Sequence, residues 1–188
     1  MGRWEPNARE RLAKAALELY GERGYEQTTV AEIAQRAGLT ERTFFRHYAD
    51  KREVLFGGST AVEELFVNAV AGAPGSAAPI DAIAAGLEAV AGLFDDRRDH
   101  SRRRQAVIVA NAELRERELI KLASIAAALA DALRGRGVAE PAASLTAEAG
   151  VAVFKVGFER WVEAAEERAM SQVMREALAE LKAVTAGG

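Results

Sequence analysis

Apolar residues recur three and four positions apart through most of the chain, a spacing that is typical of amphipathic helices. No run of alternating apolar and polar residues of the kind found in strands interrupts this pattern. Helix-breaking residues divide it at Gly24, at Gly38, within 72–79 and at 135–137. Because every segment between these breaks has a helical pattern, we predict an all-α fold.

Four helices are predicted before the break at 72–79. Their expected bounds are 6–23, 29–37, 40–48 and 51–72. The second starts at Thr29, where Glu32 stands three residues later and completes a capping box. Asp50 and Glu53 predict a second capping box at the start of the fourth helix. Two consecutive glycines at 57–58 weaken that helix and predict a kink.

Five further helices follow the break, in which two prolines and two glycines cannot continue a helix. Their expected bounds are 80–95, 99–110, 112–134, 142–167 and 170–185. The helix at 142–167 carries two apolar stripes, Val151, Phe154, Phe158 and Trp161 on one side and Leu145, Ala149, Ala152 and Val156 on the other. A helix that is apolar on both sides is sandwiched. In a chain of 188 residues we expect a second subunit on one of those sides.

Composition excludes several classes of protein. The chain has no cysteine and two histidines, which excludes disulfides, thiolate metal sites and a cysteine nucleophile. We therefore predict no metal and no cofactor. No run of about 18 apolar residues is present, and the N-terminus has no apolar core of the signal-peptide kind. These features predict a cytoplasmic protein with no membrane partner.

The net charge of −3 argues at first against a nucleic-acid partner. The distribution of charged residues along the chain changes that conclusion. Residues 36–52 contain five cations and two anions, whereas residues 57–188 contain 15 cations and 19 anions. Attraction to nucleic acid is therefore expected to be local and modest.

The segment from Thr28 to Lys51 has the layout of a helix-turn-helix, two short helices joined by a glycine turn. Its predicted apolar wedge consists of Ile33, Ala34, Ala37 and Leu39. Phe44 and Tyr48 are four residues apart, so we expect both to face the same core. The second helix then presents its other face outward, where it can enter the major groove of DNA.

Five residues remain on that outward face, namely Arg42, Thr43, Phe45, Arg46 and His47. Arginine can bind guanine through two hydrogen bonds, and threonine or phenylalanine can contact a thymine methyl group. Lys51, Thr28 and Thr29 stand at helix starts and suit phosphate contacts. The alternatives are a solvated charged helix pair and, for His47, a catalytic base, which the absence of a nearby nucleophile disfavours.

This segment resembles the DNA-binding signature of the tetracycline-repressor (TetR) family of bacterial regulators. The run TT-x-x-x-IA-x-x-AG-x-T-x-x-T-FF-R-HY-x-x-K matches nearly position for position. The resemblance implies a nine-helix homodimer, with residues 1–50 as DNA-binding domain and 51–188 as ligand-binding and dimerisation domain, in which 51–72 is the connecting helix. It implies a ligand-responsive regulator, most often a repressor and not an enzyme, that binds a palindromic double-stranded DNA operator.

The implied base or phosphate contacts are Thr40, Arg42, Thr43, Phe45, Arg46, His47 and Lys51. The family often has tyrosine where Phe45 stands. Without that hydroxyl, Phe45 can stack or contact a methyl group but cannot hydrogen-bond a phosphate.

A small-molecule site is the second candidate. Residues that would line an apolar pocket, each also a candidate for ordinary core, are Phe66, Phe94, Phe154, Phe158 and Trp161, with Asn111 and Glu113 as polar contacts. Residues 111–122 resemble C-terminal domains of mycofactocin-linked actinobacterial regulators, some of which answer to acyl-CoA, and this suggests an acyl-CoA or other lipophilic effector.

The run from Arg97 to Arg104, with five arginines, is either an anion or DNA contact or, as we favour, a solvated helix start. The alternative to a DNA-binding regulator is a helical module that binds small molecules or proteins without binding DNA.

Overall fold

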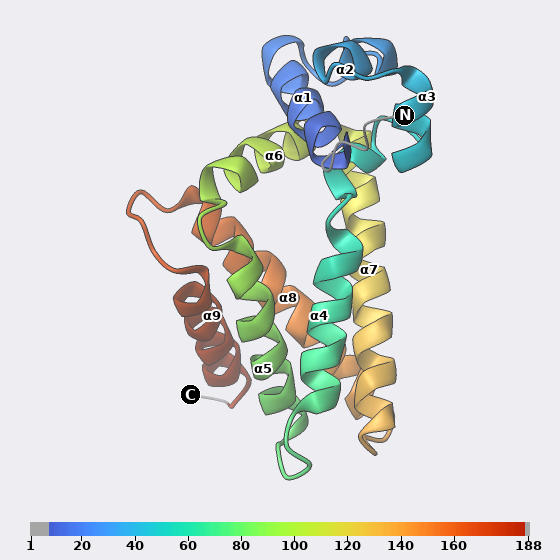
Figure 1. The fold of residues 1–188 in the computed structure, drawn as a ribbon. Coiled ribbons are helices and arrows are strands. Elements are labelled where there is room, and N and C mark those ends of the chain that lie inside the picture. The colour runs from blue at the N-terminus through green and yellow to red at the C-terminus, as the bar shows by residue number, and fades with distance from the viewer. Residues whose placement is uncertain (1–7, 187–188) are drawn as a thin grey trace. The chain divides into compact units, whose positions relative to one another are not determined.

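The computed structural model describes residues 8–186, and within this range it contains nine α-helices, two 3₁₀ turns and no strand (Figure 1). The elements are α1 (Ala8–Arg23), α2 (Val30–Arg36), α3 (Glu41–His47), η1 (Glu53–Phe56), α4 (Ser59–Gly72), α5 (Pro79–Ala91), η2 (Gly92–Phe94), α6 (Arg98–Ala110), α7 (Ala112–Gly135), α8 (Ala142–Glu163) and α9 (Met170–Thr185). The predicted all-α fold is confirmed.

The helices form two compact units. The first contains residues up to Ser59 together with 103–118, and the second contains 60–102 together with residues from Leu119 onward. Helices α6 and α7 therefore contribute residues to both units, because each unit uses one part of each helix. Each unit has a hydrophobic core of its own.

The core of the first unit is built from segments that are distant in the sequence. Its fully buried side chains include Leu12, Leu19, Ile33 and Phe44 from α1, α2 and α3. Residues 103–118 add Val107, Ile108 and Leu114 to the same core. The helix-turn-helix segment therefore rests on α1 and on parts of α6 and α7.

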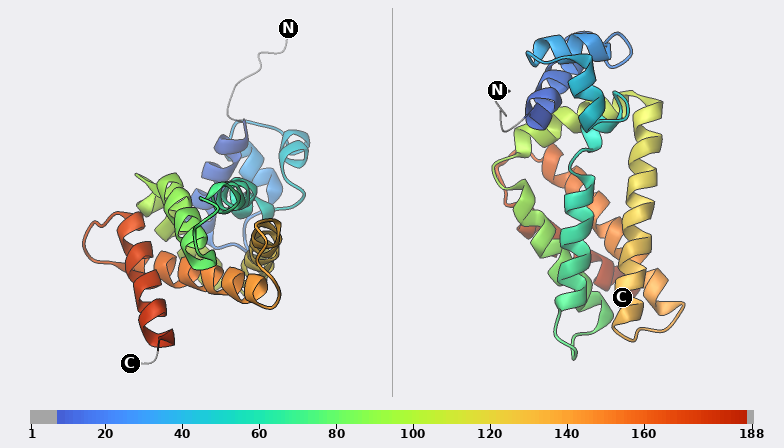
Figure 2. Two further views of the ribbon diagram at one scale, coloured as in Figure 1. Left: turned by 90° about the horizontal axis from the view of Figure 1, so that it is seen from below. Right: turned by 45° about the vertical axis from the view of Figure 1, so that its right-hand side comes forward.

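The second unit packs α4, α5, α7, α8 and α9 around one apolar core. Figures 1 and 2 show α8 running across α5, α4 and α7, with α9 beside α5 and α8. Glycines allow two of these close crossings. A Cβ atom at Gly86 of α5 would lie 2.3 Å from a ring carbon of Phe66, and one at Gly150 of α8 would lie 2.7 Å from Ile83.

Most predicted helix bounds agree with the structure within one or two residues. The predicted start of the first helix at Pro6 lies outside the described residues. The capping box at Thr29 and Glu32 is present, and Gly24 has the expected positive φ of +88°.

The predicted helix at 51–72 differs most from the structure. It is a 3₁₀ turn, η1, followed by the separate helix α4. Gly57 and Gly58 stand between these two elements, and glycine weakens a helix enough for the chain to change conformation there. Asp50 does accept bonds from the amides of Arg52 and Glu53, as a capping residue would, but it caps the turn that leads into η1.

Two other predicted helices end early. The segment predicted at 80–95 finishes as the 3₁₀ turn η2, and α8 ends at Glu163 instead of 167. Arginine side chains explain the second case. Arg98 donates to the carbonyl of Trp161 and Arg102 donates to that of Val162, so carbonyls in the last turn of α8 are satisfied without further helix.

The two apolar stripes of α8 have different environments. Val151, Phe158 and Trp161 are buried in the core, and Phe154 is half-buried. On the other stripe, Leu145 is 66% exposed and Val156 is 48% exposed. The second stripe is thus an apolar surface of this chain.

Among the described residues, one segment is long and apolar enough to be a candidate membrane span, Glu53–Gly72, with a mean hydropathy of 1.3. A core helix of a globular protein meets the same criterion, and Phe66 and Val70 of this segment are buried in the core of the second unit. This single weak candidate does not indicate a membrane protein.

Candidate nucleic-acid interface

The start of α2 and the turn that follows it are fixed by local hydrogen bonds. The amide of Glu32 donates to Oγ1 of Thr29, and the Glu32 carboxylate accepts from the amide and hydroxyl of Thr29. These bonds lower the pKa of Glu32. After α2, Gly38 has a φ of +67°, a left-handed conformation that favours glycine, and it allows the sharp reversal into α3.

Helix α3 is oriented by two buried aromatic residues. Phe44 is fully buried and Tyr48 is 5% exposed, as the spacing predicts, and their ring centroids are 5.6 Å apart. The hydroxyl of Tyr48 donates to the carbonyl of Arg9 in α1. Thr40 caps the helix through its side-chain oxygen, which accepts from the amide of Thr43. One face of α3 is therefore anchored and the other is presented outward.

The outward face carries most of the predicted contact residues. Thr40, Arg42 and Arg46 are exposed, whereas Thr43 and His47 are half-buried. Phe45 is 56% exposed, and its ring meets that of Phe44 edge-on at 5.4 Å, which restricts its orientation. An exposed phenyl group surrounded by polar and cationic side chains is suited to contact with a base or a thymine methyl group.

Ion pairs engage two of the five cations that lie between residues 36 and 52. Arg36 binds Glu22 at 2.8 Å and lies 3.6 Å from Glu18, so it holds α2 against α1. Arg52 binds Asp50, and this hydrogen bond lowers the pKa of the Asp50 carboxyl group. Among the described residues, Arg42 and Arg46 have no ion-pair partner, and these two are the exposed arginines of α3.

Thr28 lies in the turn before α2, and the side chain of Lys51, which follows α3, reaches the same turn. Thr28 is 1% exposed, and its hydroxyl donates to the carbonyl of Gly24. The ammonium group of Lys51 is directed at backbone carbonyls of that turn, 3.0 Å from that of Tyr25 and 3.2 Å from that of Thr28. The Thr28 hydroxyl and the Lys51 ammonium group, both predicted to contact phosphate, thus bind backbone carbonyls of this turn, unlike the exposed residues of α3.

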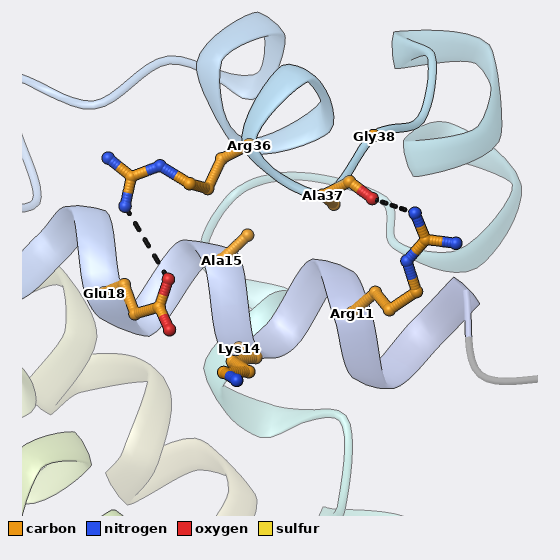
Figure 3. Close-up of a pocket in the computed structure, with 7 residues that line it drawn as sticks. All are labelled: Arg11, Lys14, Ala15, Glu18, Arg36, Ala37 and Gly38. Carbon is orange, nitrogen blue, oxygen red and sulfur yellow. Dashed lines mark hydrogen bonds and ion pairs between the residues drawn. The ribbon is translucent and has the colours of Figure 1, made fainter.

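A surface notch of about 370 Å³ lies between α1 and α2 (Figure 3). Two of the cations that line it already bind protein groups. Arg11 donates to the carbonyl of Ala37 at the end of α2, and Arg36 pairs with Glu18. We therefore assign these arginines to the attachment of α2 to α1.

Two arginines from distant parts of the chain hold η1, the turn that follows the helix-turn-helix. Nε of Arg104 donates to the carbonyl of Leu55 at 2.7 Å, and its guanidinium also contacts Glu118 and lies 5.1 Å from the ring centre of Phe56. Burial lowers the pKa of Arg104. Arg117 pairs with Glu53 in the same turn.

The arginine run from 97 to 104 is used in three ways. Arg98 and Arg102 bind the last carbonyls of α8, and Arg104 binds η1. Arg97 is exposed. The run is therefore largely committed to contacts within the protein, and the favoured interpretation of a solvated helix start describes only part of it.

The residues predicted to bind a ligand lie in two different units. Phe94, Phe154, Phe158 and Trp161 form an aromatic cluster in the second unit, with centroid distances of 5.5 to 6.3 Å. Phe66 is buried in the same unit, beneath Gly86. Asn111 and Glu113 belong to the first unit, where Nδ2 of Asn111 donates to the carbonyl of Val107.

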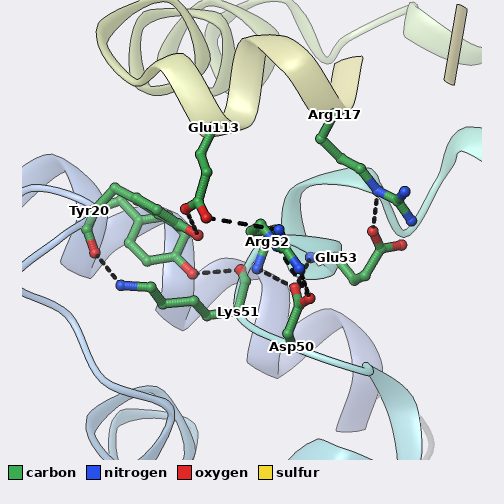
Figure 4. Close-up of polar contacts among 8 residues, drawn as sticks. Tyr20, Asp50, Lys51, Arg52, Glu53, Glu113 and Arg117 are labelled. Atoms are coloured by element: carbon green, nitrogen blue, oxygen red, sulfur yellow. Dashed lines mark hydrogen bonds and ion pairs between the residues drawn. The ribbon is translucent and has the colours of Figure 1, made fainter. Parts of the chain in front are cut away.

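Glu113, predicted as a polar contact of the ligand pocket, instead contacts Tyr25 and Arg52 of the first unit. The carboxylate of Glu113 in α7 accepts a hydrogen bond of 3.4 Å from the hydroxyl of Tyr25. It also lies 3.7 Å from Arg52 (Figure 4). No local spacing in the sequence marks this contact, because Tyr25 and Glu113 are 88 residues apart. The described residues contain no cluster of histidine, aspartate or glutamate suited to a metal ion.

Comparison with known proteins identifies both parts of the chain. Residues 12–56 match the family model of bacterial regulatory proteins of the tetR family, and residues 77–186 match that of the MftR C-terminal domain. Among relatives, the HTH-type transcriptional regulator TcmR of Streptomyces glaucescens is 40% identical over 88 residues, which span 47% of this chain and 39% of TcmR.

The regulator named MftR of Mycobacterium tuberculosis is 33% identical over 57 residues, which span 30% of this chain and 29% of MftR. Less than half of each relative's length is therefore matched. A solved structure of FadR from Bacillus subtilis in complex with stearoyl-CoA has a TM-score of 0.62 at 18% identity and covers 92% of this chain and 96% of that chain. This likeness concerns the fold.

The N-terminal match coincides with the anchored α3 and its exposed cationic face, and the C-terminal match covers more than half of the chain. The chain therefore belongs to the TetR family of bacterial transcriptional regulators, with a C-terminal part of the MftR type.

Proposed function

We propose that this protein is a DNA-binding repressor that leaves its operator when a small lipophilic effector binds. The observation that supports DNA binding most directly is the outward face of α3, which combines two unpaired arginines with an exposed phenyl ring. Such a face is complementary to the acceptor atoms and thymine methyl groups of the major groove. TetR-family regulators act on DNA and not as enzymes, and we expect this one to work in the cytoplasm.

We assign the proposed contacts by exposure. Arg42 and Arg46 supply hydrogen bonds to guanine or phosphate, and Phe45 contacts a base or a thymine methyl group. Four other residues suit phosphate or sugar contacts, namely Thr40, Thr43 and His47 of α3 and its N-cap, and Thr29 at the N-cap of α2. Thr28 and Lys51 would act through the turn that they stabilise.

Replacing Arg42 with alanine should weaken operator binding by about tenfold and relax the base preference at one position of each half-site. The reason is that an exposed guanidinium without an ion-pair partner is available for a bidentate contact with one base. Selection of bound sequences from a random DNA pool, followed by titration at several salt concentrations, measures both effects.

The exposed Arg115 of α7 provides a control. Its replacement by alanine removes the same charge from the first unit, outside α3, and should leave the base preference unchanged. If the native protein selected no sequence from the pool at low salt, the DNA-binding proposal would be wrong, and a helical module for small molecules or proteins would remain.

The exposed stripe of α8 supports a homodimer. Leu145 and Val156 expose apolar surface on the side of α8 that faces away from the core, and Ala152 lies between them. A dimer would present two copies of α3 to successive major grooves about 34 Å apart, which a palindromic operator requires.

Replacing Val156 with glutamate should raise the dimer dissociation constant by at least about tenfold, because the interface would bury an unpaired charge. Light scattering over a range of protein concentrations measures this. Replacing the exposed Lys155 with glutamate is the neighbouring control and should have a smaller effect. A native protein that remained monomeric at all concentrations would contradict the dimer.

The effector is proposed to bind in the second unit, near the aromatic cluster of Phe94, Phe154, Phe158 and Trp161. Apolar walls of this kind suit a lipophilic molecule. The solved FadR structure contains stearoyl-CoA, and we propose an acyl-CoA as the first compound to test here. Release from DNA then follows if the effector binds the DNA-free conformation more tightly, and titration of the operator complex with acyl-CoAs of increasing chain length measures that coupling.

A further inference from the structure

Lys51 connects the two ends of the helix-turn-helix. It follows α3 by four residues, and its ammonium group lies at the turn that precedes α2. The nitrogen is 3.0 Å from the carbonyl oxygen of Tyr25, 3.2 Å from that of Thr28 and 3.5 Å from that of Glu26. One cation thus binds three carbonyl groups of a single turn.

The same lysine is held from two further directions. Its ammonium nitrogen lies 4.2 Å from the ring centre of Tyr25, within the range of a cation–π contact. Its backbone carbonyl accepts a hydrogen bond of 2.7 Å from the hydroxyl of Tyr20 in α1 (Figure 4). Burial raises the pKa of the Tyr20 hydroxyl, so this donor keeps its proton throughout the physiological range.

The turn that Lys51 binds determines where α2 begins. The amide of Thr28 donates to the carbonyl of Tyr25, and the Thr28 hydroxyl donates to the carbonyl of Gly24. Thr29, the next residue, is the N-cap of α2. Without Lys51, the carbonyl groups that converge on one point would repel one another, and the start of α2 would lose its support.

A lysine ammonium has three N–H donors and no acceptor. In this structure three carbonyl oxygens lie within 3.5 Å of it, so its donors are directed into the protein. A direct phosphate contact would require the ammonium to leave these carbonyl groups.

We propose that Lys51 is a positioning residue, which supports operator binding by fixing the turn before α2 and not by binding a phosphate. The proposal rests on the proposed function, because it concerns how DNA affinity arises. Its distinguishing consequence is that the shape of the side chain matters as well as its charge. A guanidinium spreads its donors over three nitrogens in one plane, so arginine cannot direct three N–H groups from a single atom.

The first experiment uses the full-length protein without DNA. Amide hydrogen exchange is followed by NMR in the native protein and in the variants Lys51→Met and Lys51→Arg. Exchange of the Thr28 amide should become at least about tenfold faster in both variants, because its acceptor turn is no longer held. The comparison variant Arg46→Met, on the exposed face of α3, should leave this exchange rate unchanged.

The second experiment measures operator affinity against salt concentration for the same set of proteins. Lys51→Met and Lys51→Arg should both bind about tenfold more weakly, with the same salt dependence as the native protein. Arg46→Met should instead lower the slope of log K against log salt by about one unit, as expected when a phosphate contact is lost. If Lys51→Met failed to fold, Tyr25→Leu, which removes the ring beneath the ammonium, would serve in both experiments.

The outcome that would overturn the proposal combines three results: an unchanged Thr28 exchange rate, native affinity in Lys51→Arg, and a slope lowered by about one unit in Lys51→Met. Accelerated exchange and weaker binding in both variants support it. Because the exchange experiment needs no DNA, failure of the native protein to bind any operator would refute the proposed function separately.

Discussion

Replacing Arg104 with alanine should lower the free energy of unfolding of the first unit by about 3 kcal/mol. The guanidinium satisfies the carbonyl of Leu55 at 2.7 Å, pairs with Glu118 and covers the ring of Phe56. The side chains of Arg104 and Glu118 are only 22% and 25% exposed. Alanine would therefore leave a mostly buried carboxylate and a carbonyl group without their partner, which costs more than the loss of an exposed ion pair.

Urea unfolding followed by circular dichroism measures this change. Arg115→Ala is the matched control, since that arginine also lies in the first unit but is exposed, and it should change the unfolding free energy by less than about 0.5 kcal/mol. Adding Glu118→Gln to Arg104→Ala should restore part of the loss, because the unpaired charge is then removed. A loss below about 1 kcal/mol for Arg104→Ala would mean that the guanidinium contributes no more than a surface ion pair.

Replacing Gly86 with alanine should destabilise the second unit by about 3 kcal/mol. The added Cβ would lie 2.3 and 2.4 Å from two ring carbons of Phe66 and 3.0 Å from a methyl carbon of Val70. Phe66 and Val70 are buried, so neither side chain can move into solvent to relieve the overlap. Helices α4 and α5 would have to separate, and the contacts of the surrounding core would be lost.

The same substitution at Gly72 is the control, because no atom lies within 4 Å of the position that its Cβ would occupy. Gly72→Ala should leave stability unchanged or raise it by up to about 1 kcal/mol, as the helix propensity of alanine exceeds that of glycine. Thermal unfolding of both variants gives the comparison. Equal or greater stability in Gly86→Ala would show that α4 and α5 do not cross as closely as described.

The helices could be predicted from the sequence because their signals are local. The capping box at Thr29, the positive φ at Gly24 and the buried pair Phe44 and Tyr48 each depend on residues within one or two turns. The early end of α8 could not be predicted in the same way. It depends on Arg98 and Arg102, which lie about 60 residues away and take carbonyl groups in its last turn.

The candidate site likewise has some features that local spacing predicts and others that depend on the folded structure. The outward face of α3 follows from helical spacing, once Phe44 and Tyr48 are assigned to the core. The position of Lys51 does not, because its spacing suits a phosphate contact, whereas its conformation depends on three carbonyl groups that only the folded turn brings together. The count of cations between residues 36 and 52 is incomplete for the same reason, because it does not show that Arg36 is paired with acidic residues of α1.

The predicted ligand residues reveal a further limit. A periodic pattern identifies the helix to which a side chain belongs, but it does not identify the core that each part of a long helix joins. Asn111 stands at the junction of α6 and α7, and the sequence predicts it beside the aromatic residues of the pocket, yet it belongs to the first unit. Only the packing of 103–118 against the N-terminal helices determines this.

That packing has a consequence for how such regulators can be inherited and recombined. The segment that matches the tetR-family model, residues 12–56, is contiguous in the sequence, but the compact unit to which it belongs is not, because Val107, Ile108 and Leu114 complete its core from the middle of the chain. An exchange of residues 12–56 between relatives would therefore transfer α3 without the part of the core that residues 103–118 supply. Segment 103–118 has to change in step with the N-terminal helices, so successful exchanges between relatives should carry both segments together.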